Sequence, residues 1–583
     1  MPARDPGSAV DAFHDQSKHH VNRFARSSGY LDWATQPNPF RSFDGAPRID
    51  LVAPFRTATS GHSPGSSLRL RSGQAAPGLD AAYDDLFVDS SPRIVPGLEA
   101  VSVFFRYSLG LSAWKQAGGS RWALRVNPSS GNLHPTEGYA VLGPGVVSHA
   151  PGVYHYAPDV HGLEQRCLFS PEAWDAVMGA LPAGAFLAGL TSIHWREAWK
   201  YGERAFRYCQ HDVGHAIAAM RMAAALMGWR LRVLPDCSHA ALARVLGTDR
   251  EGDFGEAEPE EPACLCVVWP GPDQSRDPDD VLRLGRAVAT GAWTGRANQL
   301  SASRVQWDAI DAVADASRAP GGARRATEAI PKTSPVDRPT TVAVASAASL
   351  LLQRRSAVAM DGHSTLARDR FLMMLRRILQ SDRAPWDALW WEPRVHLVLF
   401  VHRVDGFDPG IYALARTTGA QVAMQRLFRS DFAWVRPPGV DDDIPLCLLA
   451  PRDVRRISRQ LSCAQDIAAD GFFSLGMLAD FDAALAEHGS SFYRHLFWEA
   501  GAIGQILYLE AEAAGARGTG IGCFFDDAVH EVLGITDHQF QSLYHFTVGM
   551  PVDDPRLQTL PGYSWEARMG SDLFSLSATS SDR

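Results

Sequence analysis

Two long apolar segments predict the main helices of this chain. They run from about residue 205 to 227 and from about 492 to 514, and each is followed by a glycine, Gly228 or Gly515. A glycine directly after an apolar run of this length is a common helix C-cap. Shorter apolar runs at 138–142 and 395–402 predict strands ahead of the helices. We therefore expect an α+β fold, with helices around a mixed β-sheet.

The two helices belong to a longer pattern that occurs twice. Residues 206–247 correspond to residues 493–534 at a constant offset of 287, without a gap. The matching positions of the first copy are Phe206-Arg207, Gly214, Gly228 and Val245-Leu246-Gly247. Several matches in the same order predict one domain present in two copies. Such a tandem pair often replaces a two-fold homodimer, so ligands are expected where the halves meet.

The 583 residues then divide into five parts. Residues 56–80 are rich in Ser, Gly, Arg and Pro, and residues 272–340 are polar and broken by Pro and Gly. We expect an N-terminal extension over 1–94 with a flexible part at 56–80, a first domain over 95–271, a linker over 272–340 that acts as a tether, a second domain over 341–563 and a C-terminal tail over 564–583.

The amino-acid composition excludes several classes of protein. With 46% hydrophobic and 21% charged residues, the chain is neither disordered nor fibrous. A net charge of −9 argues against nucleic acid as the main partner. Eight cysteines are too few for a disulfide framework, and Cys264 and Cys266 are expected on one face of a buried strand. We see no signal peptide and no apolar run of about 18 residues, so we expect a cytoplasmic protein away from membranes.

Three short motifs are candidates for ligand binding. Pro128-Ser-Ser-Gly-Asn132 combines small hydrogen-bonding side chains with a glycine that permits close backbone approach, although a surface turn would look the same. Arg354-Arg355-Ser356 offers two guanidinium groups and a hydroxyl suited to a phosphate, or alternatively a solvated helix end. Gly518-Thr-Gly-Ile-Gly522 exposes main-chain amides, but it follows a helix and so departs from the dinucleotide fingerprint.

Two further pairs carry titratable groups. Lys200-Tyr201 could supply a base and a hydroxyl donor at the edge of a pocket, although such pairs are common. His211 and His215 lie one helical turn apart, as in a zinc helix. The second copy has Trp498 and Ala502 at these positions and no third ligand is evident. We therefore interpret the histidines as packing residues and expect no metal.

Together these motifs resemble the FMN-dependent nitroreductases, and specifically the SagB-type dehydrogenases of thiazole- and oxazole-modified peptide pathways. The resemblance covers roughly residues 95–271 and 340–563. It implies two tandem nitroreductase-like domains that form a pseudo-dimer within one chain. In homodimers of this family each FMN lies at the interface, with the Arg-rich motif and glycine loop from one subunit and the Pro-Ser-Ser-x-Asn loop from the other.

The resemblance implies one complete FMN site. The Pro-Ser-Ser-x-Asn loop is intact only in the first half, whereas the Arg-Arg-Ser motif and the glycine loop are intact only in the second. Phe40-Arg41-Ser42 is a poor match to the Arg-rich motif. The implied cofactor-binding residues are Pro128, Ser129, Ser130, Asn132, Arg354, Arg355, Ser356, Gly518, Gly520, Ile521, Gly522 and Arg556. Arg556 could equally pair with its aspartate neighbours.

The same resemblance implies Lys200 and Tyr201 as the catalytic pair of an azoline dehydrogenase. The substrate would be an azoline-like heterocycle in a modified peptide or small metabolite, with a cyclodehydratase as a possible partner. Two alternatives stay open: an NAD(P)H-dependent nitro- or quinone reductase, and a binding partner without flavin.

Overall fold

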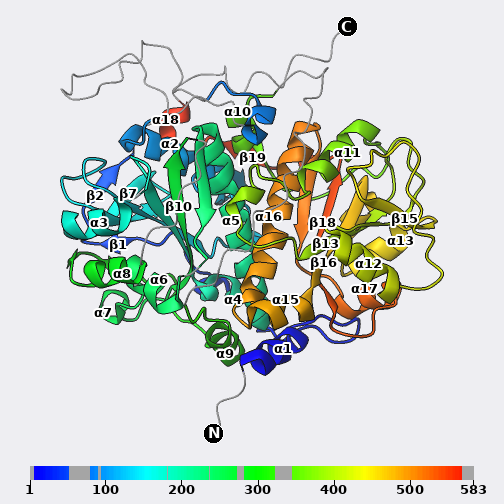
Figure 1. Ribbon diagram of the computed structural model, residues 1–583, viewed down its shortest axis with the longest axis horizontal. Coiled ribbons are helices and arrows are strands. Elements are labelled where there is room, and N and C mark those ends of the chain that lie inside the picture. Colours follow the sequence, from blue (N-terminus) through cyan, green and yellow to red (C-terminus); the bar gives the residue numbers. More distant parts are fainter. Residues whose placement is uncertain are drawn as a thin grey trace.

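A computed structural model describes residues 6–51, 79–88, 94–179, 181–235, 237–271, 281–321 and 345–567. Most of the segment expected to be flexible, 56–78, lies outside these residues. So do 272–280 and 322–340 of the expected linker, 341–344 at the start of the expected second domain, and 568–583 of the tail. The chain forms two halves that lie side by side, with two long helices between them (Figure 1).

The first half is built on an antiparallel sheet of eight strands. Its order is β11-β7-β6-β5-β8-β10-β9, with β2 also paired to β7. The strands are β2 (Arg48–Asp50), β5 (Thr136–Leu142), β6 (Gly152–Ala157), β7 (Gly162–Leu168), β8 (Phe186–Ser192), β9 (Trp229–Val233), β10 (Glu261–Pro270) and β11 (Ala292–Trp293). The helices are α2 (Leu98–Ser108), α3 (Pro171–Met178), α4 (His194–Tyr201), α5 (Ala205–Leu226), α6 (His239–Leu246), α7 (Glu251–Phe254) and α8 (Val281–Ala289).

The second half repeats this arrangement on a six-stranded antiparallel sheet. Its order is β15-β14-β13-β16-β18-β17. The strands are β13 (Val395–Val401), β14 (Gly410–Leu414), β15 (Leu446–Pro451), β16 (Phe473–Asp480), β17 (Arg517–Ile521) and β18 (Phe540–Gly549). The helices are α10 (Ala347–Gln353), α11 (Arg368–Arg377), α12 (Thr418–Leu427), α13 (Arg455–Leu461), α14 (Ile467–Asp470), α15 (Phe481–His488), α16 (Phe492–Ala513) and α17 (Asp526–Leu533).

The predicted α+β fold with two similar domains is confirmed. Strands β7, β6, β5, β8, β10 and β9 stand in the same order as β15, β14, β13, β16, β18 and β17. The helices α5 and α16 each have 22 residues, and their first residues are separated by the offset of 287 seen in the sequence. The sheets are not mixed as we expected: all strand pairs within the two sheets are antiparallel, and parallel pairing occurs at isolated bridges such as Ser356–Gly518.

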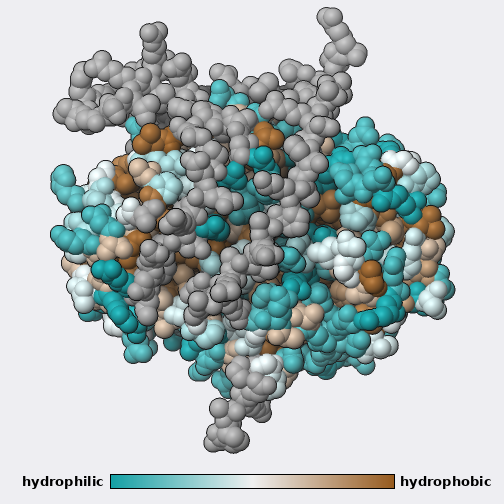
Figure 2. All heavy atoms as spheres, viewed as in Figure 1, coloured by the Kyte–Doolittle hydropathy of each residue, from teal (hydrophilic) through white to brown (hydrophobic). Residues whose placement is uncertain are grey.

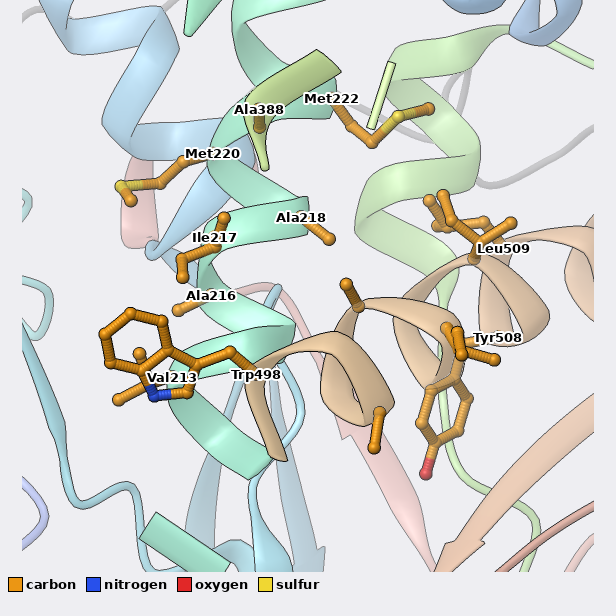
Figure 3. Close-up of a cluster of buried hydrophobic side chains, with 14 of the residues drawn as sticks. Val213, Ala216, Ile217, Ala218, Met220, Met222, Ala388, Trp498, Tyr508 and Leu509 are labelled. Atoms are coloured by element: carbon orange, nitrogen blue, oxygen red, sulfur yellow. The ribbon is translucent and has the colours of Figure 1, made fainter. Parts of the chain in front are cut away.

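Helices α5 and α16 cross at the centre of the molecule. A Cβ atom built on Gly214 would lie 2.2 Å from the carbonyl oxygen of Trp498, and one built on Gly501 would lie 2.2 Å from that of His211. The contact is reciprocal at equivalent positions, as in an isologous dimer interface. Many side chains around this crossing are apolar, and Figure 3 shows Trp498 beside Val213. The two halves therefore share one core.

The N-terminal residues and the expected linker both contain a helix that completes this interface. Helix α1 (Pro6–Gln16) and helix α9 (Asp308–Ala316) lie together at the bottom of Figure 1. Each is followed by a serine, Ser17 or Ser317, whose hydroxyl accepts a hydrogen bond of 2.9 Å from Arg207 or Arg494. These arginines are 287 residues apart, so the two helices occupy equivalent places.

The linker is more than the tether that we expected. Helix α8 packs against α6 and α3, with Leu284 and Val288 fully buried. Short strand β12 (Arg296–Ala297) pairs with β1 (Phe43–Asp44). Polar composition hid helix α8 because it buries only a narrow apolar stripe.

The C-terminal segment crosses onto the first half. Strand β19 (Gln558–Leu560) pairs with β3 (Leu111–Ala117), which also pairs with β4 (Ser120–Arg125). Beyond it, the short helix α18 (Ser564–Ala567) begins the expected tail, and Glu566 forms a salt bridge with the buried Arg106. The two halves are therefore joined by exchanged segments as well as by their central helices.

The outer surface is mostly hydrophilic on the face seen in Figure 2, with small separate hydrophobic patches. Among the described residues, no helix combines the length and the apolar character needed to cross a membrane.

Candidate functional site

A cavity of about 740 Å³ lies between the two halves, within the size range of small-molecule sites. The first half contributes β3, β4, the loop after β4, and residues of α4 and α5. The second half contributes the segment after α10, strand β17, and residues of α16 and β18. The sequence-predicted residues that line it are Pro128, Ser129, Ser130, Asn132, Tyr201, Arg354, Arg355, Ser356, Gly520, Ile521 and Gly522. Motifs more than 200 residues apart are thus brought together.

The loop that contains Pro128, Ser129, Ser130 and Asn132 is fixed mainly to its own domain. The backbone amide of Ser130 donates to Asp212 Oδ1 at 3.2 Å, and the Ser129 hydroxyl donates to Glu197 Oε1 at 3.3 Å. Asn132 donates to the carbonyl oxygen of Ala123 at 2.8 Å. The loop is therefore a preformed wall of the cavity rather than a loose surface turn.

Arg354 and Arg355 form a strongly positive part of the cavity wall. Arg354 donates to the carbonyl oxygens of Val126 and Arg125, both at 3.1 Å, and thus ties the second half to the first. Arg355 donates to Ser112 Oγ at 3.1 Å. Burial, followed by the neighbouring Arg354, lowers the pKa of Arg355 to about 9.

Neither guanidinium forms a salt bridge within the described part of the chain. Among the described residues, the two guanidinium groups donate to backbone carbonyls and to the Ser112 hydroxyl. Arg354 is buried and Arg355 is partly buried, and the Glu512 carboxylate accepts from the Arg355 backbone amide at 2.9 Å rather than from either guanidinium. Two adjacent cations that are withdrawn from water are stabilised when an anion binds to them. Lys115 and Arg517 line the same end of the cavity. The donor set therefore fits a phosphate group.

Strand β17 runs beside Ser356. The Ser356 hydroxyl and the Gly520 amide both lie 2.9 Å from the hydroxyl of Tyr508. A Cβ atom on Gly520 would lie 1.9 Å from the hydroxyl of Tyr544. The absence of a side chain at position 520 thus allows aromatic side chains to pack against the strand. Gly518 does not line the cavity, but it pairs with Ser356 and so connects the two motifs.

Lys200 and Tyr201 stand at the end of α4, near the loop. A Cβ atom on Gly131 would lie 2.6 Å from the Tyr201 hydroxyl and 3.3 Å from Lys200 Nζ. Lys200 is exposed, whereas Tyr201 is largely enclosed. Burial and then the nearby Glu197 raise the pKa of Tyr201 well above its usual value. Tyr201 is therefore a hydroxyl donor at neutral pH.

Two buried carboxyl groups beside the loop were missed by sequence reasoning. Glu197 and Asp212 are each 1% exposed or less. Burial raises the pKa of both, and the Asp212 charge raises that of Glu197 further. The spacing of these residues in the sequence could have indicated them. Glu197 lies one helical turn before Tyr201, and Asp212 lies one helical turn after Tyr208. Both tyrosines line the cavity. Perturbed carboxyl groups of this kind are frequent at functional sites.

The remaining candidates from the sequence are Arg556 and the His211–His215 pair. Arg556 does not line the cavity, because its exposed guanidinium pairs with Asp554 at 2.7 Å. The ring of His211 stacks on Tyr544 at a centroid distance of 4.2 Å, and His215 Nε2 lies 3.2 Å from the Tyr544 hydroxyl. These contacts give both histidines a packing role within the described residues.

The pseudo-equivalent position on the other side of the interface is filled. The cavity there has about 40 Å³ and is bordered by His495 and Trp498. Trp391 packs against both, with ring centroids 4.9 and 6.5 Å away. Glu499, the counterpart of Asp212, is paired with Arg416. Arg41, the poor match to the Arg-rich motif, is bound by Glu260 at 3.0 Å.

Residues 442–550 match the model of the Nitroreductase family. The sequence similarity to this family thus lies in the second half of the chain. No curated protein sequence shows a significant match to the chain.

Solved structures extend the similarity to both halves. A protein from Anabaena variabilis that is classed as a nitroreductase superposes with a TM-score of 0.62 at 21% identity, over 93% of this chain and 99% of its own. The whole chain thus has a nitroreductase-type fold. The E. coli microcin synthetase McbBCD complex with truncated pro-MccB17 bound is matched over 38% of this chain and 79% of its own, with a TM-score of 0.26 and 16% identity.

Proposed function

We propose that this protein is an FMN-dependent oxidoreductase with one flavin between its two halves. The observation that carries the proposal is the adjacent Arg354–Arg355 pair, whose guanidinium groups form no salt bridge among the described residues and line the same cavity of about 740 Å³ as the preformed loop. A phosphate at this end of the cavity would compensate both cations, and charge-assisted hydrogen bonds of this kind are strong.

The other residues of the cavity suit the rest of the cofactor. Ser356 and the amides of β17 would approach the phosphate or the ring edge from the second half, and Ser129, Ser130 and Asn132 from the first. The aromatic side chains of Tyr208 and Tyr544 also line the cavity and supply flat apolar surface. Bound FMN would accept a hydride from the substrate.

We further propose that the reaction is the oxidation of an azoline-like heterocycle in a peptide or small metabolite. Lys200 would remove the proton from the ring carbon, and the Tyr201 hydroxyl, held protonated by its raised pKa, would donate a hydrogen bond to the substrate. The position of Lys200 supports this role, because a Cβ atom on Gly131, which lines the cavity, would lie 3.3 Å from Lys200 Nζ. A cyclodehydratase, which makes azolines, is then a plausible partner in the same sequence of reactions.

The filled pseudo-equivalent position supports a single flavin per chain. In the second half, the counterparts of Tyr208 and His211 are His495 and Trp498. Together with Trp391, these side chains fill the space that is an open cavity on the other side of the interface.

The test is reconstitution of the full chain with FMN, followed by anaerobic mixing with an azoline-containing peptide. We expect one FMN per chain, bleaching of the flavin absorbance and formation of the azole. Bleaching by NAD(P)H with a nitro or quinone acceptor, without azoline oxidation, would favour the reductase alternative. A chain that binds no FMN would leave the binding-partner alternative and contradict the proposal.

A further inference from the structure

Two cysteines from different segments meet beside the cavity. Cys523 follows strand β17 and lines the cavity, and Cys463 lies in the turn after α13. Their Sγ atoms are 2.7 Å apart, although 60 residues separate them in the sequence. Both side chains are partly exposed, whereas the other six cysteines are buried.

The turn that holds Cys463 has an unusual backbone. Cys463 and Ala464 are consecutive residues with positive φ, 51° and 58°. This conformation is unfavourable for residues other than glycine and is found mainly where the surrounding structure enforces it, often at functional sites. The side chain of Gln465 donates to the carbonyl oxygen of Cys523 at 3.0 Å and fixes the turn against the cavity wall.

The surroundings of Cys523 favour its thiolate. Cys463, His19 and Arg204 all lower the pKa of the Cys523 thiol. The Nδ1 atom of His19 accepts a hydrogen bond from the Ala25 amide at 2.9 Å, so Nε2 carries the proton of a neutral ring and can donate to the sulfur. A thiolate that is accessible and lies next to a second thiol is the usual arrangement of a redox-sensitive pair.

We propose that Cys463 and Cys523 form a reversible disulfide in response to peroxide, with Cys523 as the reacting and Cys463 as the resolving cysteine. The Cys523 sulfur attacks one oxygen of hydrogen peroxide, the O–O bond breaks, and the released hydroxide takes a proton to form water. The sulfenic acid on Cys523 is then attacked by the Cys463 sulfur, which loses its proton. The S–O bond breaks and a second water leaves. Two thiols and one peroxide thus give one disulfide and two waters.

Peptide mapping tests the pairing in the full chain, with or without flavin. Trypsin cleavage after Arg459, Arg494, Arg517 and Arg556 places each cysteine alone in its own peptide, 460–494 or 518–556. After hydrogen peroxide and alkylation under non-reducing conditions, we expect these two peptides linked to each other. Two of the eight thiols should be lost and should return with dithiothreitol.

Single variants separate the two roles. Cys463→Ser should leave a sulfenic acid on Cys523 that dimedone traps, whereas Cys523→Ser should leave Cys463 unmodified. Cys447→Ser, at a buried position of β15, is the matched control and should form the disulfide normally. Recovery of both peptides alkylated and unlinked after peroxide would overturn the proposal, and so would equal dimedone labelling of the two single variants.

Discussion

Gly214 and Gly501 touch at the crossing of α5 and α16: a Cβ atom on Gly501 would lie 3.0 Å from the Cα atom of Gly214. The two glycines are equivalent in the repeat, so the contact lies close to the pseudo-two-fold relation between the halves. Because the cavity is lined from both halves, the separation of the two helices sets its width. The contact between Gly214 and Gly501 thus affects the geometry of the cavity between the halves.

Gly214→Ala should destabilise the protein strongly. The added methyl group would lie 2.2 Å from the Trp498 carbonyl oxygen, and a backbone atom in a packed helix cannot move aside as a side chain can. Overpacking of this type costs about 1–3 kcal/mol or more. Thermal or denaturant unfolding measures the loss. Gly419→Ala in α12, where no atom lies within 4 Å, is the matched control and should be neutral or slightly stabilising. Equal stability of the two variants would contradict the crossing geometry.

Much of the fold was accessible from the sequence because its strongest signals are local or repeated. The helix lengths, the strands before them and the constant offset all follow from apolar periodicity and glycine positions. The helices α1 and α9 were missed, although Ala9-Val-Asp-Ala12 and Ala309-Ile-Asp-Ala312 match. Their offset is 300 rather than 287, so a search for repeats at the constant offset does not detect them.

The site was only partly predictable for a different reason. The Arg-Arg-Ser, Pro-Ser-Ser-x-Asn and glycine motifs have recognisable residue types, and the fold brings them to one cavity. Glu197 and Asp212 are ordinary acidic residues in the sequence, and only burial beside Ser129 and Ser130 makes them unusual. Burial beside a loop that is distant in the sequence depends on tertiary packing, which a single sequence does not reveal.

Arg355→Ala should weaken FMN binding by roughly 10- to 100-fold, because loss of a hydrogen bond to a charged group costs about 1.5–3 kcal/mol. The folded apoprotein should lose little stability, since the substitution also removes a buried cation next to Arg354. Fluorescence titration with FMN gives the affinity. Arg556→Ala, whose guanidinium pairs with Asp554 outside the cavity, should bind FMN normally. A similar loss in both variants would refute the assigned phosphate end.

Lys200→Ala should retain FMN and lower turnover on the order of 10²- to 10⁴-fold, the usual contribution of a general base. Lys200→Arg separates proton transfer from charge, because a guanidinium keeps the positive charge but does not release a proton. We expect it to be as inactive as the alanine variant, and we expect small primary amines to restore part of the Lys200→Ala activity. High activity of Lys200→Arg would show that charge alone is needed. Steady-state rates and flavin content are the measurements.

Asp212 should make the protein less stable as the pH rises. Burial raises its pKa from 3.8 to about 7, so between these pH values the folded state binds more protons than the unfolded state. The free energy of unfolding then falls with pH, by up to about 1.4 kcal/mol per unit for this group. Asp212→Asn keeps an oxygen that can accept from the Ser130 amide but does not titrate.

The difference in unfolding free energy between Asp212→Asn and the unaltered protein reports Asp212 together with its effect on Glu197, because the contributions of groups that titrate alike in both proteins cancel. We expect the variant to gain relative stability from pH 4 to 7 and the difference to level off above pH 7. Denaturant unfolding of the two proteins across this range measures it. The buried Asp526 provides a contrast of opposite sign, because Arg204 and Arg207 lower its pKa and its stabilising effect is lost only as the pH falls. A pH-independent difference for Asp212→Asn would mean that Asp212 is ionised in the folded protein throughout this range, and its assignment as a perturbed carboxyl group would be wrong.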